Sequence, residues 1–87
     1  MRKVRVKIAL GLHARPATVI ARLLQNTKSS VLFTYRKETI NARSIMSILM
    51  LAATKNSLIT VVIDGDDAKE IMDRLVQAFD AEFGEIA

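Results

Sequence analysis

The alternation of strand-type and helix-type hydrophobic patterns along the chain constrains its fold most. In residues 2–8 apolar and basic side chains alternate, the apolar ones being Val4, Val6 and Ile8. This period of two predicts a strand with one buried face. From Ala14 the apolar residues recur with a helical period, at Ala17, Ile20, Ala21 and Leu24. The chain therefore begins with a predicted strand followed by a predicted helix.

The same two patterns recur to the end of the chain. Strand patterns follow at residues 30–36, Thr39–Ala42 and 58–64. Helical patterns follow at residues 44–54, where Ser44 is a suitable N-cap, and at 68–83. The order β-α-β-β-α-β-α, in which strands and helices do not strictly alternate, indicates an α+β fold. We expect one domain over residues 1–87, a two-layer sandwich whose four-stranded, mainly antiparallel sheet is covered by helices on one face.

The composition excludes several kinds of site and location. With no Cys and one His among 87 residues, the chain cannot form a disulfide or a conventional zinc site. The basic start lacks the apolar run and the cleavage site of a signal peptide. No stretch approaches the roughly 18 apolar residues that span a bilayer. We therefore expect a cytoplasmic domain with no metal, no cofactor and no membrane insertion.

The net charge of +4 conceals a strong asymmetry along the chain. Residues 1–55 contain eleven Lys or Arg and a single acid, which gives a formal charge of +10, whereas residues 56–87 carry −6. A basic region of this kind favours acidic or phosphorylated partners, nucleic acid among them. A basic α+β nucleic-acid-binding module is therefore an alternative. We do not favour it, because the strand aromatics Phe33 and Tyr35 are expected on the buried face and not exposed for base stacking.

The only histidine lies where the first predicted strand gives way to the first helix, in the stretch "GLHARPAT". If the helix begins at Ala14, His13 stands at its N-cap, and Gly11 allows the sharp turn before it. Pro16 falls in the first turn, where a residue without an N–H group breaks no hydrogen bond. The amides of Ala14 and Arg15 are then among the donors that the helix leaves unused.

These donors, the positive end of the helix dipole and the Arg15 guanidinium together predict a site suited to phosphate. Two uses of the site differ in kind. His13 either helps to hold an anionic ligand, or its neutral imidazole attacks a phosphorus atom and becomes phosphohistidine. A capping histidine without any ligand is the third interpretation, and the spacing alone does not decide among them.

"GLHARPAT", followed about thirty residues later by "ARSIMSILML", resembles the histidine-containing phosphocarrier proteins (HPr) of the bacterial phosphoenolpyruvate-dependent sugar phosphotransferase system. The similarity covers essentially the whole chain and implies their open-faced β-sandwich. It also implies a covalent phosphoryl carrier and not an enzyme. His13 matches the histidine that is phosphorylated on Nδ1, Arg15 matches the arginine that stabilises the phosphate, and Pro16 matches the proline that shapes the helix start.

The resemblance implies partners as well. Enzyme I would donate the phosphoryl group and IIA components of sugar permeases would accept it. The residues that match the apolar docking surface are Ile45, Met46 and Leu49. Ser44 matches a serine that a kinase phosphorylates in some bacterial groups, which adds a serine kinase or phosphorylase and transcriptional regulators as partners. A carrier that presents its site to several partners is expected to be a monomer. Leu10 and Ser47 depart from the common family pattern, so a nitrogen-branch paralogue with a regulatory role stays the alternative.

Overall fold

The computed structural model describes residues 1–84 and has the element order that the sequence predicts. The strands are β1 (Arg2–Arg5), β2 (Ser30–Tyr35), β3 (Glu38–Asn41) and β4 (Leu58–Asp64). The helices are α1 (Ala14–Leu23), α2 (Ile45–Leu51) and α3 (Ala68–Asp80), followed by the 3₁₀ turn η1 (Glu82–Gly84). None of the helices in this described part is long and apolar enough to cross a membrane.

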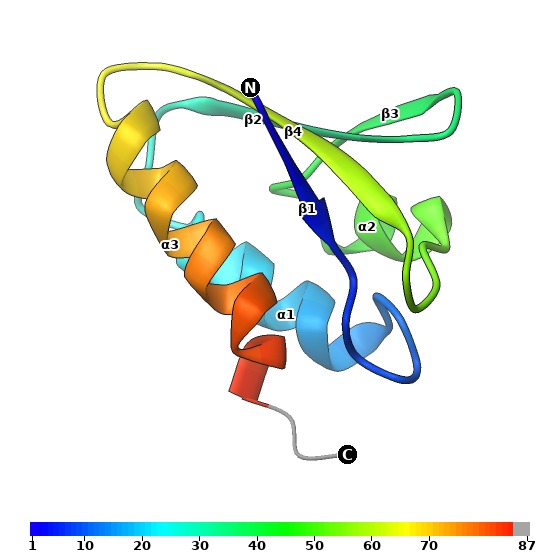
Figure 1. Cartoon of the computed structure of the whole chain (residues 1–87). Helices are drawn as coiled ribbons and strands as arrows, with labels where there is room; N and C mark the ends of the chain where they lie inside the picture. Colours follow the sequence, from blue (N-terminus) through cyan, green and yellow to red (C-terminus); the bar gives the residue numbers. More distant parts are fainter. Residues whose placement is uncertain (85–87) are drawn as a thin grey trace.

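The four strands form one sheet in the order β1-β4-β2-β3, and every neighbouring pair is antiparallel. β4 thus lies inside the sheet, whereas β1 and β3 form its edges. The helices lie together on one face and the other face is open (Figure 1). This arrangement confirms the predicted open-faced β-sandwich.

The core lies between the sheet and the helices and has the residues that the two hydrophobic periods select. Val4, Val6 and Ile8 are buried from the first strand pattern, as are Ile20 and Leu24 from the first helix pattern. A row of aromatic rings extends the core along α3. The Phe33 and Phe79 rings meet edge to face at 6.0 Å, and Phe79 meets Phe83 at 4.8 Å. The burial pattern therefore fixes which face of each element meets the core.

The ends of several elements differ from the sequence expectation. β1 stops at Arg5 and not at residue 8, because Val6 pairs with two residues of the segment that directly precedes β4. The Val6 amide donates to the Ser57 carbonyl at 2.9 Å, and the Asn56 amide donates to the Val6 carbonyl at 2.7 Å. Two residues opposite one interrupt the regular ladder, as in a bulge.

The helical patterns at 44–54 and 68–83 are also longer than the helices observed. α2 ends at Leu51 because Ala52 takes a left-handed conformation, with φ 54°. α3 ends at Asp80 because Glu82 and Phe83 have positive φ. The strand expected at Thr39–Ala42 starts and stops one residue earlier. These turns depend on backbone conformations that hydrophobic periodicity does not report.

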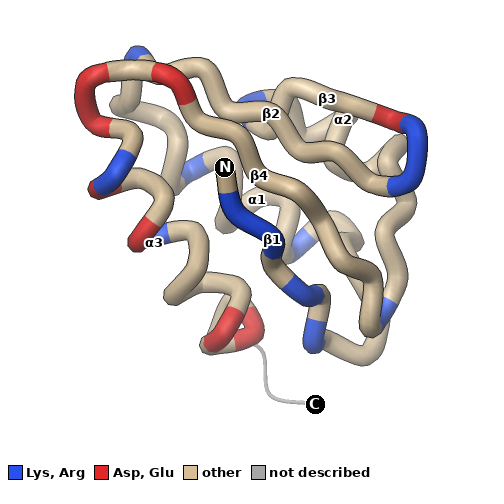
Figure 2. Tube along the Cα trace, turned by 45° about the horizontal axis from the view of Figure 1, so that its top comes forward, with Lys and Arg blue, Asp and Glu red and all other residues tan. Residues whose placement is uncertain are grey.

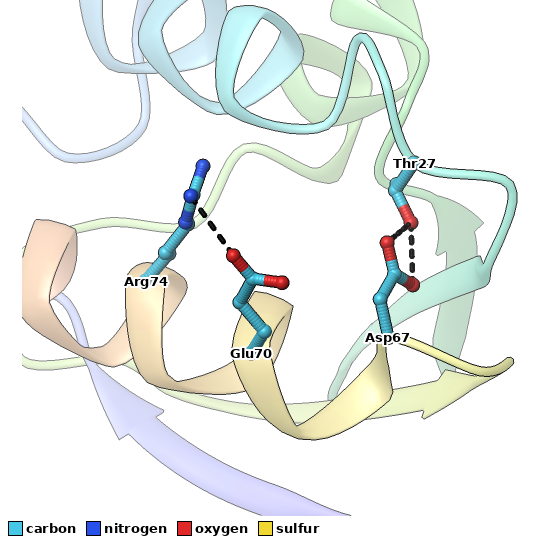
Figure 3. A network of polar contacts seen from close by, with 4 residues as sticks. All are labelled: Thr27, Asp67, Glu70 and Arg74. Carbon is cyan, nitrogen blue, oxygen red and sulfur yellow. Dashed lines mark hydrogen bonds and ion pairs between the residues drawn. The ribbon is translucent and has the colours of Figure 1, made fainter.

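Asp67, the residue before α3, connects this helix to the loop between α1 and β2 (Figure 3). Thr27 Oγ1 lies 2.7 and 2.6 Å from the two carboxylate oxygens of Asp67 and shares its one hydroxyl hydrogen between them, and Ser29 Oγ donates to Oδ1. These bonds from Ser29 and Thr27 hold the pKa of Asp67 below its ordinary value. The Arg74–Glu70 pair in the same view spans 3.0 Å between exposed side chains, so it contributes little to stability.

Replacing Asp67 with asparagine is expected to destabilise the protein in a pH-dependent way. A carboxyl group whose pKa is lowered by folding adds stability that is complete above its unfolded-state pKa, about 3.9. That stability is lost as the pH falls through the lower folded-state pKa. In urea unfolding, Asp67→Asn should therefore be clearly less stable than the parent at pH 7, and the difference should shrink in strong acid. Asp66→Asn, at an exposed neighbouring position, is the control, and a difference independent of pH would contradict the assignment.

Candidate functional site

The loop between β1 and α1 is held against the loop that joins α2 to β4 (Figure 1). The Leu12 amide donates to the Ala53 carbonyl at 2.9 Å, and the Gly11 amide donates to the Ile8 carbonyl at 3.0 Å. Gly11 has φ +72°, and a Cβ atom there would collide with the Ala53 carbonyl oxygen and stand 2.9 Å from Thr54 Cα. Glycine is therefore required by both the conformation and the close approach of the two loops.

His13 is the N-cap of α1, as the sequence predicts. Its backbone is extended, with φ −95° and ψ −166°, and its carbonyl accepts the Ala17 amide at 3.0 Å. Its own amide donates to the Gly11 carbonyl at 3.0 Å. Hydrogen bonds of both its backbone amide and its carbonyl thus hold His13 in place, and the residue is half-buried.

The first turn of α1 offers donors to an anion. Ala14 and Arg15 are its first two residues and both are exposed. Helical bonds cannot use their amides, because the carbonyls four residues earlier lie before the helix. Pro16 follows them, is buried and has no amide hydrogen to lose. The turn also contains no acidic residue, so the helix dipole and the Arg15 guanidinium act on an anion without opposition.

The supporting role of residues 53 and 54 is the part of the site that the sequence analysis missed. Ala53 acts through its backbone carbonyl, which any residue type can supply, so no sequence signal marks it. The one available signal is Gly11, because a glycine before the helix indicates that something approaches closely there. Only the fold identifies Thr54 as the neighbour.

Ser44 and the apolar residues after it form a second group of candidate residues. Ser44 is the N-cap of α2, and its Oγ accepts the Ser47 amide at 3.2 Å. Ile48 and Leu51 of α2 are buried. The side chains that face outward are Ile45, Met46 and Met50, which are 39%, 67% and 78% exposed, together with the half-buried Leu49. We call these four residues the α2 surface, and its exposure is typical of an interaction site.

A groove of about 380 Å³ lies between α1 and the start of α2. Thr18, which is bonded to the Ala14 carbonyl at 2.8 Å, lies on one wall, and Ile45 lies on the other. Arg22 and Arg43 also line the groove. A partner that covers the α2 surface would therefore meet cationic side chains at the C-terminal end of α1 and just before α2.

Comparison with known proteins agrees with this fold. The family model described as "PTS HPr component phosphorylation site" matches residues 1–81. The phosphocarrier protein HPr of Chlamydia pneumoniae is 48% identical over 81 residues, which cover 93% of this chain and 75% of that protein. The HPr of Chlamydia muridarum is 46% identical over 76 residues, which cover 87% of this chain and 73% of that protein.

Solved structures give the same result. HPr-C-His from Thermoanaerobacter tengcongensis superposes with a TM-score of 0.91 at 30% identity, over 100% of both chains. The phosphocarrier protein HPr of Bacillus anthracis superposes with a TM-score of 0.84 at 32% identity, over 90% of this chain and 93% of the other. Sequence and structure agree over nearly the full length, so this chain belongs to the HPr family of phosphocarrier proteins of the phosphotransferase system.

Proposed function

We propose that this chain carries a phosphoryl group on Nδ1 of His13, received from enzyme I and passed to IIA components of sugar permeases, as a cytoplasmic monomer. The observation that carries the proposal is the position of the single histidine at the N-cap of α1, beside two exposed helix amides. In the transfer, the Nδ1 lone pair forms a bond to phosphorus. The bond from phosphorus to the donor breaks, and its electron pair stays with the donor.

The chain's part in this step is positioning and charge stabilisation. A phosphoryl group needs donors aimed at its oxygens more than it needs added covalent chemistry. The amides of Ala14 and Arg15 supply such donors at the positive end of α1, and the Arg15 guanidinium adds a charged one. The same groups stabilise the phosphoryl group when His13 receives it and when His13 passes it on. The site therefore suits a carrier that both accepts and donates a phosphoryl group.

Partner docking belongs to the α2 surface. Exposed Met and Ile side chains adapt to several partner surfaces, and the arginines of the neighbouring groove suit acidic ones. Phosphorylation of Ser44 by a serine kinase would add close to two negative charges at the edge of this surface. The modification would leave the helix intact, because phosphate is favourable at an N-cap, and it would weaken the docking of apolar or acidic partners.

Arg15→Ala is expected to slow phosphoryl transfer from enzyme I by about a hundredfold, the low end of the cost of removing one preorganised donor. Stability should change little, because Arg15 is exposed. Rapid-quench measurement of transfer at saturating donor checks the rate. Arg74→Ala, which removes an exposed cation from α3, should transfer at the parent rate. Equal rates for Arg15→Ala and the parent would exclude the proposed role of the guanidinium.

The proposal as a whole is tested by incubating the chain with enzyme I and ³²P-labelled phosphoenolpyruvate. A phosphoramidate bond is labile to acid, so we expect an acid-labile label on the chain. Adding a IIA component should then remove that label from the chain. If enzyme I becomes labelled while the chain does not, the proposed function is wrong.

A further inference from the structure

A second basic region lies at the turn between β2 and β3, near the end of the sheet that carries the His13 loop. Arg36 and Lys37 form the turn, and both are exposed. The Arg36 guanidinium is 5.2 Å from the centre of the Tyr35 ring, an attractive cation–π geometry that holds it at the turn. Lys55, also exposed, lies in the loop that precedes β4. We call Arg36, Lys37 and Lys55 the hairpin surface.

The sheet topology places these cations at the same end of the sheet. Thr34 of β2 pairs with Thr60 of β4. Arg36 follows the end of β2 and lines a cleft together with Thr54, the residue before Lys55. Figure 2 shows basic residues beside an acidic one at the β2–β3 turn, whereas acidic residues mark the β4–α3 connection and alternate with basic ones on α3. The β4–α3 connection therefore forms an acidic end opposite the basic β2–β3 turn, and α3 returns from it to place Asp80 beside Lys7 of the β1–α1 loop.

The charges of the hairpin surface are not neutralised within residues 1–84. The ion pairs in this part of the chain join Lys7 to Asp80 and Arg74 to Glu70. Glu38 follows the turn and is also exposed, but it forms no ion pair in the same residue range. Uncompensated cations on a rim attract acidic surfaces and raise association rates.

A cleft lies between the hairpin surface and the α2–β4 loop that supports the His13 loop. It has a volume of about 340 Å³, lies between the β2–β3 turn and the C-terminal end of α2, and is lined by Tyr35, Arg36, Glu38, Leu51, Ala52 and Thr54. Thr54 is also the residue against which Gly11 packs, and the preceding carbonyl holds the Leu12 amide. A partner seated at His13 is therefore within reach of the cleft.

We propose that the protein that exchanges the phosphoryl group with His13 makes a second contact, through its carboxylates, with the hairpin surface. This contact adds to the α2 surface, which extends from Ile45 to Met50, next to the cleft residue Leu51, and it rests on the proposed function. An acidic protein is favoured over nucleic acid because the strand aromatics do not form a stacking platform. Phe33 is buried and Tyr35 is half-buried on the side of the helices.

The test compares two double variants that change the net charge equally. Lys37→Glu with Lys55→Glu is expected to raise the KM for transfer from enzyme I at least about tenfold at low salt, with kcat unchanged. The effect should fade towards about 1 M salt, where the Debye length is about 3 Å. Arg2→Glu with Lys69→Glu removes two exposed cations from the acidic end and should change the KM less than about twofold.

Equal increases for both double variants would show that only net charge matters, and an unchanged KM for Lys37→Glu with Lys55→Glu would exclude the contact. If that variant loses binding to RNA at physiological ionic strength but keeps the parent KM, the surface serves nucleic acid and the proposal is wrong. The parent chain separates the two claims. Absence of phosphohistidine on the parent contradicts the proposed function, whereas a labelled parent with insensitive variants contradicts only the second contact.

Discussion

Replacing His13 with alanine is expected to abolish acid-labile labelling of the chain by enzyme I. The sequence contains no second histidine and no cysteine, so no other side chain offers a comparable nucleophile at neutral pH. The measurement is the amount of acid-labile ³²P on the chain after incubation with labelled phosphoenolpyruvate and enzyme I. We expect the His13→Ala label to fall to the background seen without enzyme I.

Two controls separate chemistry from folding in this experiment. Ser44→Ala should keep the full label, because the hydroxyl is not the acceptor from enzyme I. The stability of His13→Ala should stay within about 1 kcal/mol of the parent, a typical cost of an N-cap substitution. The backbone bonds that fix this residue, to Gly11 and from Ala17, survive the change. Acid-labile label on folded His13→Ala would refute the assignment.

Replacing Gly11 with alanine is expected to lower the free energy of unfolding by about 2–3 kcal/mol. The positive φ of Gly11 costs an alanine about 1–2 kcal/mol. The collision with the Ala53 carbonyl also displaces the acceptor of the Leu12 amide, and losing that bond costs about 1 kcal/mol. Since Leu12 directly precedes His13, transfer should slow as well. Urea unfolding and transfer kinetics on the same preparation measure both effects.

Gly84 is the matched control, because it has φ +75° but a Cβ atom there would meet nothing within 4 Å. Gly84→Ala thus introduces the same backbone strain without a collision, in η1 and not in the loop between β1 and α1. We expect it to cost about 1–2 kcal/mol and to leave transfer unchanged. If Gly11→Ala costs no more than Gly84→Ala and transfers at the parent rate, the two loops do not support each other as described.

The fold was largely predictable because each element has a clear hydrophobic period. Val4, Val6 and Ile8 alternate with cations and are buried, which leaves one orientation for the first strand. The ends were less predictable. The bulge at Asn56 and Ser57 depends on the partner strand, and a left-handed alanine at position 52 is a conformation that alanine seldom adopts.

The candidate site divides in the same way into local and non-local parts. The N-cap position of His13 and the buried Pro16 follow from a few neighbouring residues, so the sequence located them. The Ala53 carbonyl that holds the Leu12 amide comes from a segment some forty residues away. The bond from Thr27 to Asp67 likewise spans 40 positions. Contacts of this range depend on how the layers pack, which no local pattern contains.

Nuclear magnetic resonance of the phosphorylated, ¹⁵N-labelled chain tests the central claim most directly, because it locates the phosphorus. We predict that phosphorus is bonded to Nδ1 of His13 and that the amide signals of Ala14 and Arg15 move on phosphorylation, as donors to the new oxygens would. Phosphorus on a hydroxyl oxygen, or on the imidazole with both amide signals unmoved, would contradict the account.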